Sequence, residues 1–354
     1  MALDFSNIHS LKRFEQKNSK RQKTDFNFER EYNFSIDVDR NLSIFPFFER
    51  DIDLNEAVFF DTETTGLSHG AGNMVFLAGL GFLKGKKFVV RQYFVSNPSV
   101  EHRLIETVID LFSKKNVVVT YNGKCFDIPV IRTRCALNGI CEPEIEQIDL
   151  YHISRFVWKD RLKGFRLVDV EKDILNFTRK GDLPGSMAPF AYREFLLRGE
   201  KKLLEKVFRH NLTDVYSLFK LFLRVGDESR WDILHAKARK HFKEKNFEAA
   251  LEYLRKVVKL NIPENFKKDA YFLASMCLKR IGELEKAVLL WKRIGDVPSL
   301  IELAKFYEHK KRNYSKALVF TDLAIKNTSL SSPLYADLLK REKRLRNKVK
   351  TLFT

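Results

Sequence analysis

Apolar and polar positions in the first two-thirds of the chain follow patterns that predict strands and helices in mixed order. Short apolar or alternating segments predict three successive strands at 57–60, 74–82 and 87–95. Apolar residues then recur at helical spacing over 99–114, and a short buried strand is expected at 117–119. This order of elements predicts an α/β domain with a mixed sheet.

The pattern changes after Val225, and from Trp231 onward it is helical throughout. Three similar segments recur there, each with a central alanine: 246–253, 282–289 and 312–318. The alanines lie 37 and 30 residues apart, which brackets the 34-residue period of tetratricopeptide repeats. We therefore expect a tetratricopeptide-like array of about three units, followed by a terminal helix over 333–350.

Gly226-Asp227 is a natural boundary between the two patterns. We predict a basic N-terminal arm at 1–40, an α/β domain at 41–225 and a helical repeat domain at 230–354. Residues 1 to about 25 are polar and basic and are expected to be loosely ordered, whereas Tyr32 to Val38 alternates apolar and polar as a strand does.

The first expected strand ends in Asp61-Thr62-Glu63, so two carboxylates lie one residue apart. Successive side chains of a strand point to opposite faces, which places Asp61 and Glu63 on one face. Two such carboxylates repel each other unless a cation lies between them, and Mg²⁺ takes oxygen ligands of this kind. The pair therefore indicates a metal site. The alternative is an exposed strand end with solvated acids.

A second acidic position is Asp127, in the first turn of a helix that follows Tyr121-Asn122-Gly123-Lys124. Ligands of open α/β sheets collect at the carboxyl ends of strands, so Asp127 could point over the strand ends toward Asp61. The alternative is an acid that only complements the dipole at a helix N-terminus.

A third position is the pair His210 and Asp214, within a segment of helical periodicity. Residues four apart lie on one helix face. An imidazole beside a carboxylate suits a metal ligand and a general base. The alternative is a His–Asp pair on a helix surface, without chemistry.

Charge and aromatic residues indicate a polyanionic partner. The chain has 64 Lys and Arg against 46 Asp and Glu, a formal net charge of +18, and most of the excess follows Val225. The segment 155–166 interleaves basic residues with Phe156, Trp158 and Phe165, as a surface that tracks a nucleic-acid strand would. The alternatives are a solvated basic surface and an amphipathic helix with its aromatic residues in the core.

No run of 18 apolar residues is present, so we expect no membrane span. The four cysteines show no metal-binding spacing and are expected as free thiols in a reducing cytoplasm.

Together, Asp61-x-Glu63, Asp127 and His210-x-x-x-Asp214 resemble the three exonuclease motifs of the DEDD superfamily of 3′→5′ exonucleases. More narrowly, residues from about 40 to 225 resemble the YprB-type ribonuclease-H-like domain of bacteria. Further segments that carry this resemblance are Phe60-Asp61-Thr62-Glu63-Thr64-Thr65-Gly66-Leu67, Gly70-Ala71-Gly72, Tyr121-Asn122-Gly123-Lys124-x-Phe126-Asp127, Asp149-Leu150-x-His152, Arg155-x-x-Trp158-Lys159, Val170-Glu171, Asp182-Leu183-Pro184-Gly185 and His210-Asn211-x-x-Asp214. One departure is that histidine-type members place His five residues before the last Asp, whereas the gap here is four.

The resemblance implies a ribonuclease-H-like fold and hydrolysis of DNA or RNA, with a single-stranded end as the expected substrate, by two Mg²⁺ or Mn²⁺ ions. It implies that Asp61 bridges the ions, that Glu63 and Asp214 complete one site and that Asp127 holds the second. His210 would orient or deprotonate the attacking water. Within the matched motifs, the candidates for substrate binding are Thr64, Tyr121, Asn122, Lys124 and Asn211.

Three hypotheses follow. The first is a metal-dependent 3′→5′ exonuclease. The second is a nucleic-acid-binding module without turnover, with the repeats as a scaffold for a protein partner. The third is a tetratricopeptide adaptor whose nuclease domain acts only within an assembly. The four carboxylates favour the first, because a site without catalysis has no reason to keep like charges together.

Overall fold

The structure, a computed structural model, describes residues 28–38, 41–44, 46–48, 50–66 and 71–351. The chain divides into two compact units, Met1–Asp227 and Glu228–Thr354, which we describe separately. The first 27 residues of the predicted arm, and residues 67–70 of the glycine loop, lie outside the described residues.

The first unit is built on a six-stranded mixed sheet with the strand order β1-β6-β5-β4-β7-β8. Its strands are β1 (Phe28–Ser35), β4 (Ala57–Thr64), β5 (Val75–Lys84), β6 (Lys87–Phe94), β7 (Val117–Thr120) and β8 (Glu146–Asp149). β1, β6, β5 and β4 pair antiparallel, whereas β7 and β8 continue the sheet parallel to β4. The predicted mixed sheet is therefore confirmed.

Residues 28–35 fall within the range 1–40 assigned to the arm, and they overlap the strand expected over 32–38. They form β1, which pairs along its whole length with β6 at the edge of the sheet. Phe34 of β1 is buried against the ring of Tyr216, with ring centroids 4.4 Å apart. Phe34 is therefore part of the core of the first unit.

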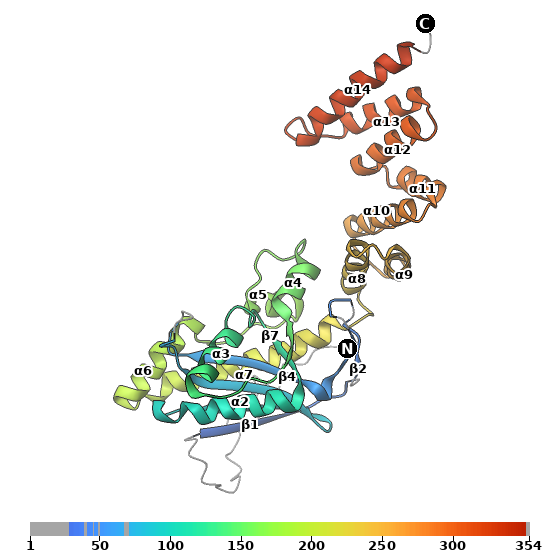
Figure 1. Cartoon of the computed structure of the whole chain (residues 1–354). Helices are drawn as coiled ribbons and strands as arrows, with labels where there is room; N and C mark the ends of the chain where they lie inside the picture. Colours follow the sequence, from blue (N-terminus) through green and yellow to red (C-terminus); the bar gives the residue numbers. More distant parts are fainter. Residues whose placement is uncertain (1–27, 39–40, 45, 49, 67–70, 352–354) are drawn as a thin grey trace. The chain divides into compact units, whose positions relative to one another are not determined.

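The two faces of the sheet are covered by two long helices, α2 (Glu101–Lys115) and α7 (Lys201–Val225), as Figure 1 shows. Phe59 and Phe60, which are neighbours in β4, pack against different helices because their side chains point to opposite faces of the sheet. Phe59 contacts the ring of Phe219 on α7, and Phe60 contacts the ring of Phe112 on α2. Because Asp61 and Glu63 alternate with the same period as Phe59, they face α7.

Helix α7 lies close to the sheet because β5 has glycine at two positions on that face. A Cβ atom on Gly79 would lie 2.3 Å from Asn211 Oδ1 and 2.8 Å from Val215 Cγ2. A Cβ atom on Gly81 would lie 2.7 Å from Val215 Cγ1. Gly79 is also the partner of Asp61 in the β4–β5 register. The absence of both side chains lets α7 bring its polar residues to the end of β4.

The remaining elements of the first unit connect and close these layers. They are β2 (Asn41–Leu42), β3 (Ile52–Asp53), η1 (Leu54–Glu56), η2 (Pro98–Val100), α3 (Asp127–Asn138), α4 (Leu150–Trp158), α5 (Leu167–Ile174), η3 (Gly185–Met187) and α6 (Ala188–Arg198). Of the three aromatic residues interleaved with basic ones at 155–166, Trp158 on α4 is fully buried and cannot stack on a base, whereas Phe156 and Phe165 are half-buried. Arg155 and Lys159 are exposed.

The second unit consists of helical pairs and a terminal helix, which fits tetratricopeptide-like repeats. Its helices are α8 (Trp231–Lys243), α9 (Phe247–Val257), α10 (Glu264–Arg280), α11 (Leu284–Ile294), α12 (Val297–His309), α13 (Tyr314–Lys326) and α14 (Pro333–Thr351). The central alanines of the three similar segments, Ala250, Ala287 and Ala317, are all fully buried. Small side chains there let paired helices approach closely, as expected.

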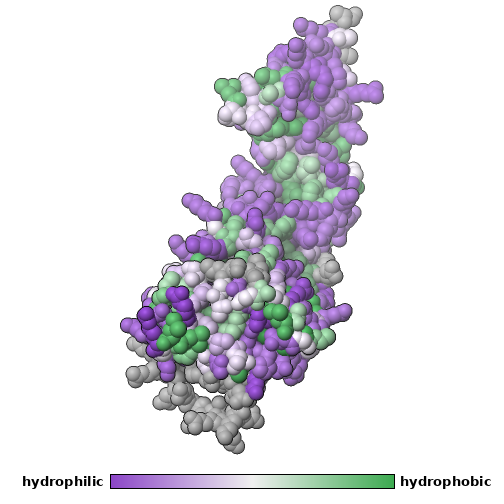
Figure 2. Space-filling model, turned by 60° about the vertical axis from the view of Figure 1, so that its left-hand side comes forward, coloured by the Kyte–Doolittle hydropathy of each residue, from purple (hydrophilic) through white to green (hydrophobic). Residues whose placement is uncertain are grey.

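Hydrophilic side chains cover most of the visible face at the C-terminal end of the chain, in the upper part of Figure 2. Basic residues on α14 contribute to this surface, and the exposed ones include Lys340, Lys343 and Lys350. Among all described residues, no helix combines the length and the apolar character that crossing a membrane requires.

Candidate active site

Two carboxylates at the end of β4 form the centre of the candidate site. Glu63 is 8 % exposed, and Asp61 is held by Asn211 of α7, whose Nδ2 donates to Asp61 O at 3.1 Å and to Asp61 Oδ2 at 2.8 Å. Asn211 is fixed in turn, because Gln92 Nε2 donates to its Oδ1 at 2.8 Å. The position of Asp61 therefore depends on a buried amide pair as well as on the strand.

Asp127 reaches the same strand end from the opposite side, as the first residue of α3. Its Oδ1 accepts from Thr62 N at 3.0 Å and from Thr62 Oγ1 at 2.6 Å. The loop before α3 is held by Asp149 at the end of β8, which accepts the backbone N–H groups of Asn122 and Lys124. Asn122 has a φ of 61°, a left-handed conformation that asparagine tolerates well.

His210 and Asp214 lie one turn apart on α7, as the sequence predicts, with His210 Nε2 3.4 Å from Asp214 Oδ2. The other ring nitrogen, Nδ1, lies 2.9 Å from Asp182 Oδ2. With Nδ1–H donating to Asp182, the ring is oriented so that Nε2 faces Asp214. The imidazole is thus held between two carboxylates.

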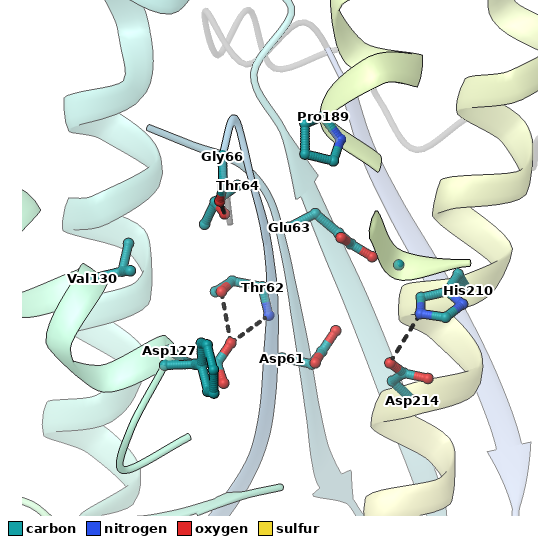
Figure 3. A pocket seen from close by; sticks show the side chains of 12 residues that line it. Asp61, Thr62, Glu63, Thr64, Gly66, Asp127, Val130, Pro189, His210 and Asp214 are labelled. Atoms are coloured by element: carbon teal, nitrogen blue, oxygen red, sulfur yellow. Dashed lines mark hydrogen bonds and ion pairs between the residues drawn. The ribbon is translucent and has the colours of Figure 1, made fainter. Parts of the chain in front are cut away.

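The four carboxylates and His210 line one pocket of about 260 Å³, seen in Figure 3. Asp61 lies between Asp127 on one side and Asp214 on the other, while Glu63 and His210 lie nearer to Pro189. The described residues that line the pocket are Asp61, Thr62, Glu63, Thr64, Gly66, Phe126, Asp127, Val130, Gly185, Pro189, His210 and Asp214. The structure therefore brings all five residues of the predicted catalytic set to one cavity.

The carboxylates of the pocket carry more negative charge than the protein compensates. Burial, followed by the charges of Asp214 and Asp127, raises the pKa of Asp61 well above its usual range. Burial raises the pKa of Glu63 to about 8, with His210 opposing the rise and Asp214 adding to it. Burial also raises the pKa of Asp127 to about 6, against the hydrogen bonds from Thr62. Full ionisation of the group therefore calls for added positive charge.

His210 responds to the same charges in the opposite direction. Burial alone would lower the pKa of His210, but Asp214 and the hydrogen bond to Asp182 outweigh it and bring the pKa to about 9. This raised pKa favours the protonated imidazole, in which both nitrogens carry a proton.

Three residues of the site were not singled out by the sequence: Arg179, Glu171 and Asp182. Arg179 is only 8 % exposed, and its guanidinium contacts Glu171, Asp182 and Asp214. Glu171 and Asp182 belong to segments that carry the family resemblance, which was the one signal available for them. Nothing in the local pattern indicates Arg179, because its partners come from α5, from the loop before η3 and from α7.

The candidates for substrate binding have different locations. Thr64 lines the pocket, whereas Tyr121, Asn122 and Lys124 are not among its described lining residues. Tyr121 instead donates its hydroxyl to Phe165 O at 2.7 Å. Asn211 is fully buried beneath Asp61, so our prediction that it contacts substrate is wrong, and it holds Asp61 in place instead.

The donor set fits hard divalent cations. All four acidic side chains of the pocket offer oxygen atoms, and burial together with neighbouring carboxylates raises the pKa of three of them. Within the described residues, no three His, Cys, Asp or Glu side chains are already gathered as a ligand cage. Asp214 in particular is engaged by Arg179.

The fold and the acidic pocket define the class of protein: residues 58–225 match the ribonuclease H superfamily. A domain of this superfamily is typical of nucleases, which generally use divalent metals. The chain is 33 % identical over 299 residues to YprB of Bacillus subtilis (strain 168), described as an uncharacterized protein. This similarity covers 78 % of the chain and 71 % of YprB, and the chain belongs to the same family.

Two solved structures have weaker similarity. The crystal structure of MamA matches with a TM-score of 0.27 and 18 % identity, over 40 % of this chain and 89 % of MamA. The family B DNA polymerase of Pyrobaculum calidifontis matches with a TM-score of 0.38 and 12 % identity, over 82 % of this chain and 45 % of the polymerase. Both scores are low, and we draw nothing on function from them.

Proposed function

We propose that this chain is a metal-dependent 3′→5′ exonuclease that hydrolyses phosphodiester bonds of DNA or RNA. One observation carries the proposal: carboxylates from β4, α3 and α7 line a single pocket at the end of a central strand. The polarity comes from the resemblance to the DEDD exonucleases. The membership of the ribonuclease H superfamily supports the chemistry.

Asp61, Glu63, Asp127 and Asp214 are the residues that would hold two Mg²⁺ or Mn²⁺ ions. When bound, such ions polarise a phosphate and lower the pKa of a water molecule. Asn211 keeps Asp61 at the end of the strand, and Thr62 keeps Asp127 turned toward it. The unfavourable ionisation of the buried carboxylates supports this assignment, because it is relieved when cations are present.

For His210 we propose proton exchange at Nε2. Asp182 holds Nδ1, so Nε2 is the nitrogen left to face the pocket. A general base or acid must lie within hydrogen-bond reach of its water, and the position of Nε2 beside Asp214 meets this requirement.

Positive charge outside the pocket supports a nucleic-acid substrate. Exposed basic residues on α4 and α14, together with the net charge of +18, would add counterion-release affinity for a polyanion. The helical repeats could also bind a protein partner. We propose the cytoplasm as the location, since the four cysteines form no disulfide.

The test uses single strands of DNA and RNA labelled at the 5′ end or at the 3′ end, with Mg²⁺ or Mn²⁺ present. A ladder that shortens from the 3′ end, lost in Asp61→Asn, is the expected result. Calorimetric titration with Mn²⁺ should in parallel show binding to the wild type and much weaker binding to Asp61→Asn. Intact strands under both metals would overturn the proposed exonuclease, and strand binding without cleavage would instead support a nucleic-acid-binding module.

A further inference from the structure

Arg179 is a buried cation inside an acidic site, and the roles proposed above do not account for it. Its Nε and Nη2 donate to Glu171 Oε2 and Oε1 at 2.7 and 2.6 Å, a bidentate pair. Its Nη1 donates to Asp182 Oδ2 at 3.0 Å, and its Nη2 also pairs with Asp214 Oδ1. One guanidinium therefore joins three carboxylates from three separate segments of the chain.

Stability alone does not explain such a cluster. A buried ion pair loses hydration on both partners, and replacing it by apolar residues is often neutral or stabilising. The side chain of Glu171 is 1 % exposed, so the loss of hydration applies to it in full. What a rigid guanidinium supplies is geometry, because its donors lie in one plane at fixed angles.

The two carboxylate oxygens of Asp214 have different partners. Oδ1 pairs with Arg179, whereas Oδ2 faces His210 Nε2. Asp182, the third partner of Arg179, is also the residue that accepts from His210 Nδ1. Arg179 also contacts the imidazole directly, with Nη1 3.2 Å from His210 Nδ1, yet it is not among the described residues that line the pocket.

We infer that Arg179 is a positioning residue of the active site: anchored by Glu171, it fixes Asp214 and, both directly and through Asp182, His210, so that Asp214 presents only Oδ2 to the pocket. This inference rests on the proposed nuclease function. It also means that a divalent cation competes with the guanidinium for Asp214. Arg179 therefore weakens cation binding at rest while it maintains the geometry needed for turnover.

The experiment measures turnover on a single strand and Mn²⁺ binding without nucleic acid, in the same set of full-length variants. Arg179→Lys keeps the charge but loses the planar fork, and we expect kcat to fall about 10- to 100-fold with KM for the strand little changed. Glu171→Gln removes the anchor without touching the pocket lining, and should lower kcat in the same way. Arg179→Gln should lower kcat while it tightens Mn²⁺ binding on the order of tenfold, because a competing positive charge is gone.

Arg134 provides the matched control. It is another largely buried arginine of the same unit, paired with Glu101, whose side chain is 4 % exposed, and it does not line the pocket. Arg134→Lys and Arg134→Gln should lower thermal stability while kcat and Mn²⁺ affinity stay within about twofold of wild type.

The inference is overturned if Arg179→Lys and Glu171→Gln both keep the wild-type kcat. It is also overturned if Arg179→Gln loses Mn²⁺ affinity together with kcat, since general damage to the fold would produce that result. If Arg179→Gln does not fold, the other two variants decide. A wild type that binds Mn²⁺ but cleaves nothing refutes the proposed function alone, since the Mn²⁺ affinities of Arg179→Gln and Arg134→Gln still test the competition at Asp214.

Discussion

Replacing Gly79 by alanine tests whether the close approach of α7 to the sheet positions the site. The added Cβ would lie 2.3 Å from Asn211 Oδ1 and 2.8 Å from Val215 Cγ2, both closer than atoms can pack. Asn211 cannot turn away at low cost, because its side chain is buried and bonded to both Gln92 and Asp61. Either α7 moves outward or the hydrogen bonds to Asp61 break.

Both responses have a predictable size. Overpacking of a core position costs about 1–3 kcal/mol of unfolding free energy. For a unit of 227 residues, each kcal/mol lowers the melting temperature by about 2–4 °C. Displacement of a group that holds a metal ligand typically lowers metal affinity about 10- to 100-fold. Gly79→Ala should therefore lose stability and Mn²⁺ affinity together.

Two further alanine variants separate these effects. In Gly81→Ala the new Cβ would lie 2.7 Å from Val215 Cγ1 and 2.4 Å from Phe88 Cζ, so it should lose stability without disturbing Asn211. In Gly72→Ala nothing lies within 4 Å of the new atom, so stability should be unchanged. Thermal unfolding and Mn²⁺ calorimetry on the three variants provide the test. Equal Mn²⁺ affinity in Gly79→Ala and Gly81→Ala would refute the link from Gly79 through Asn211 to Asp61.

Three more predictions concern the charged groups of the first unit. Burial raises the pKa of Glu63 from 4.5 to about 8, so the metal-free fold should lose stability as the pH rises between these values. Glu63→Gln should flatten this pH dependence and raise the melting temperature at about pH 8. An unchanged pH profile in this variant would contradict the reasoning. Mn²⁺ should raise the wild-type melting temperature more at about pH 8 than at about pH 6, because the carboxylates of the pocket must lose protons before they bind it. A chelator should reverse the gain. Equal gains at both pH values would count against carboxylate ligation. Asp149→Ala removes the acceptor for the N–H groups of Asn122 and Lys124 and should cost about 1–3 kcal/mol in denaturant unfolding; wild-type stability in this variant would show that the loop does not need it.

Local periodicity was sufficient for the central strands, for the main helices and for four residues of the site. The apolar run that becomes β4 places Asp61 and Glu63 on one face, and helical spacing places His210 and Asp214 one turn apart on α7. The helical pairs of the second unit follow from a period that is visible in the sequence. These features depend on spacing along the chain, either within a few residues or over the repeat period, and so they can be derived without the fold.

Contacts between distant residues were decided only by the tertiary structure. Arg179 meets Asp214 across 35 positions of sequence, and Asn211 meets Asp61 across 150. The burial of Trp158 and the pairing of β1 with β6 are of the same kind. The sequence by itself determined which carboxylates could gather. The packing of α7 on the sheet determined how close these carboxylates lie, how strongly they repel each other and that Arg179 is a cation among them. The reason is that Coulomb energies and pKa values depend on distance and burial rather than on spacing along the chain.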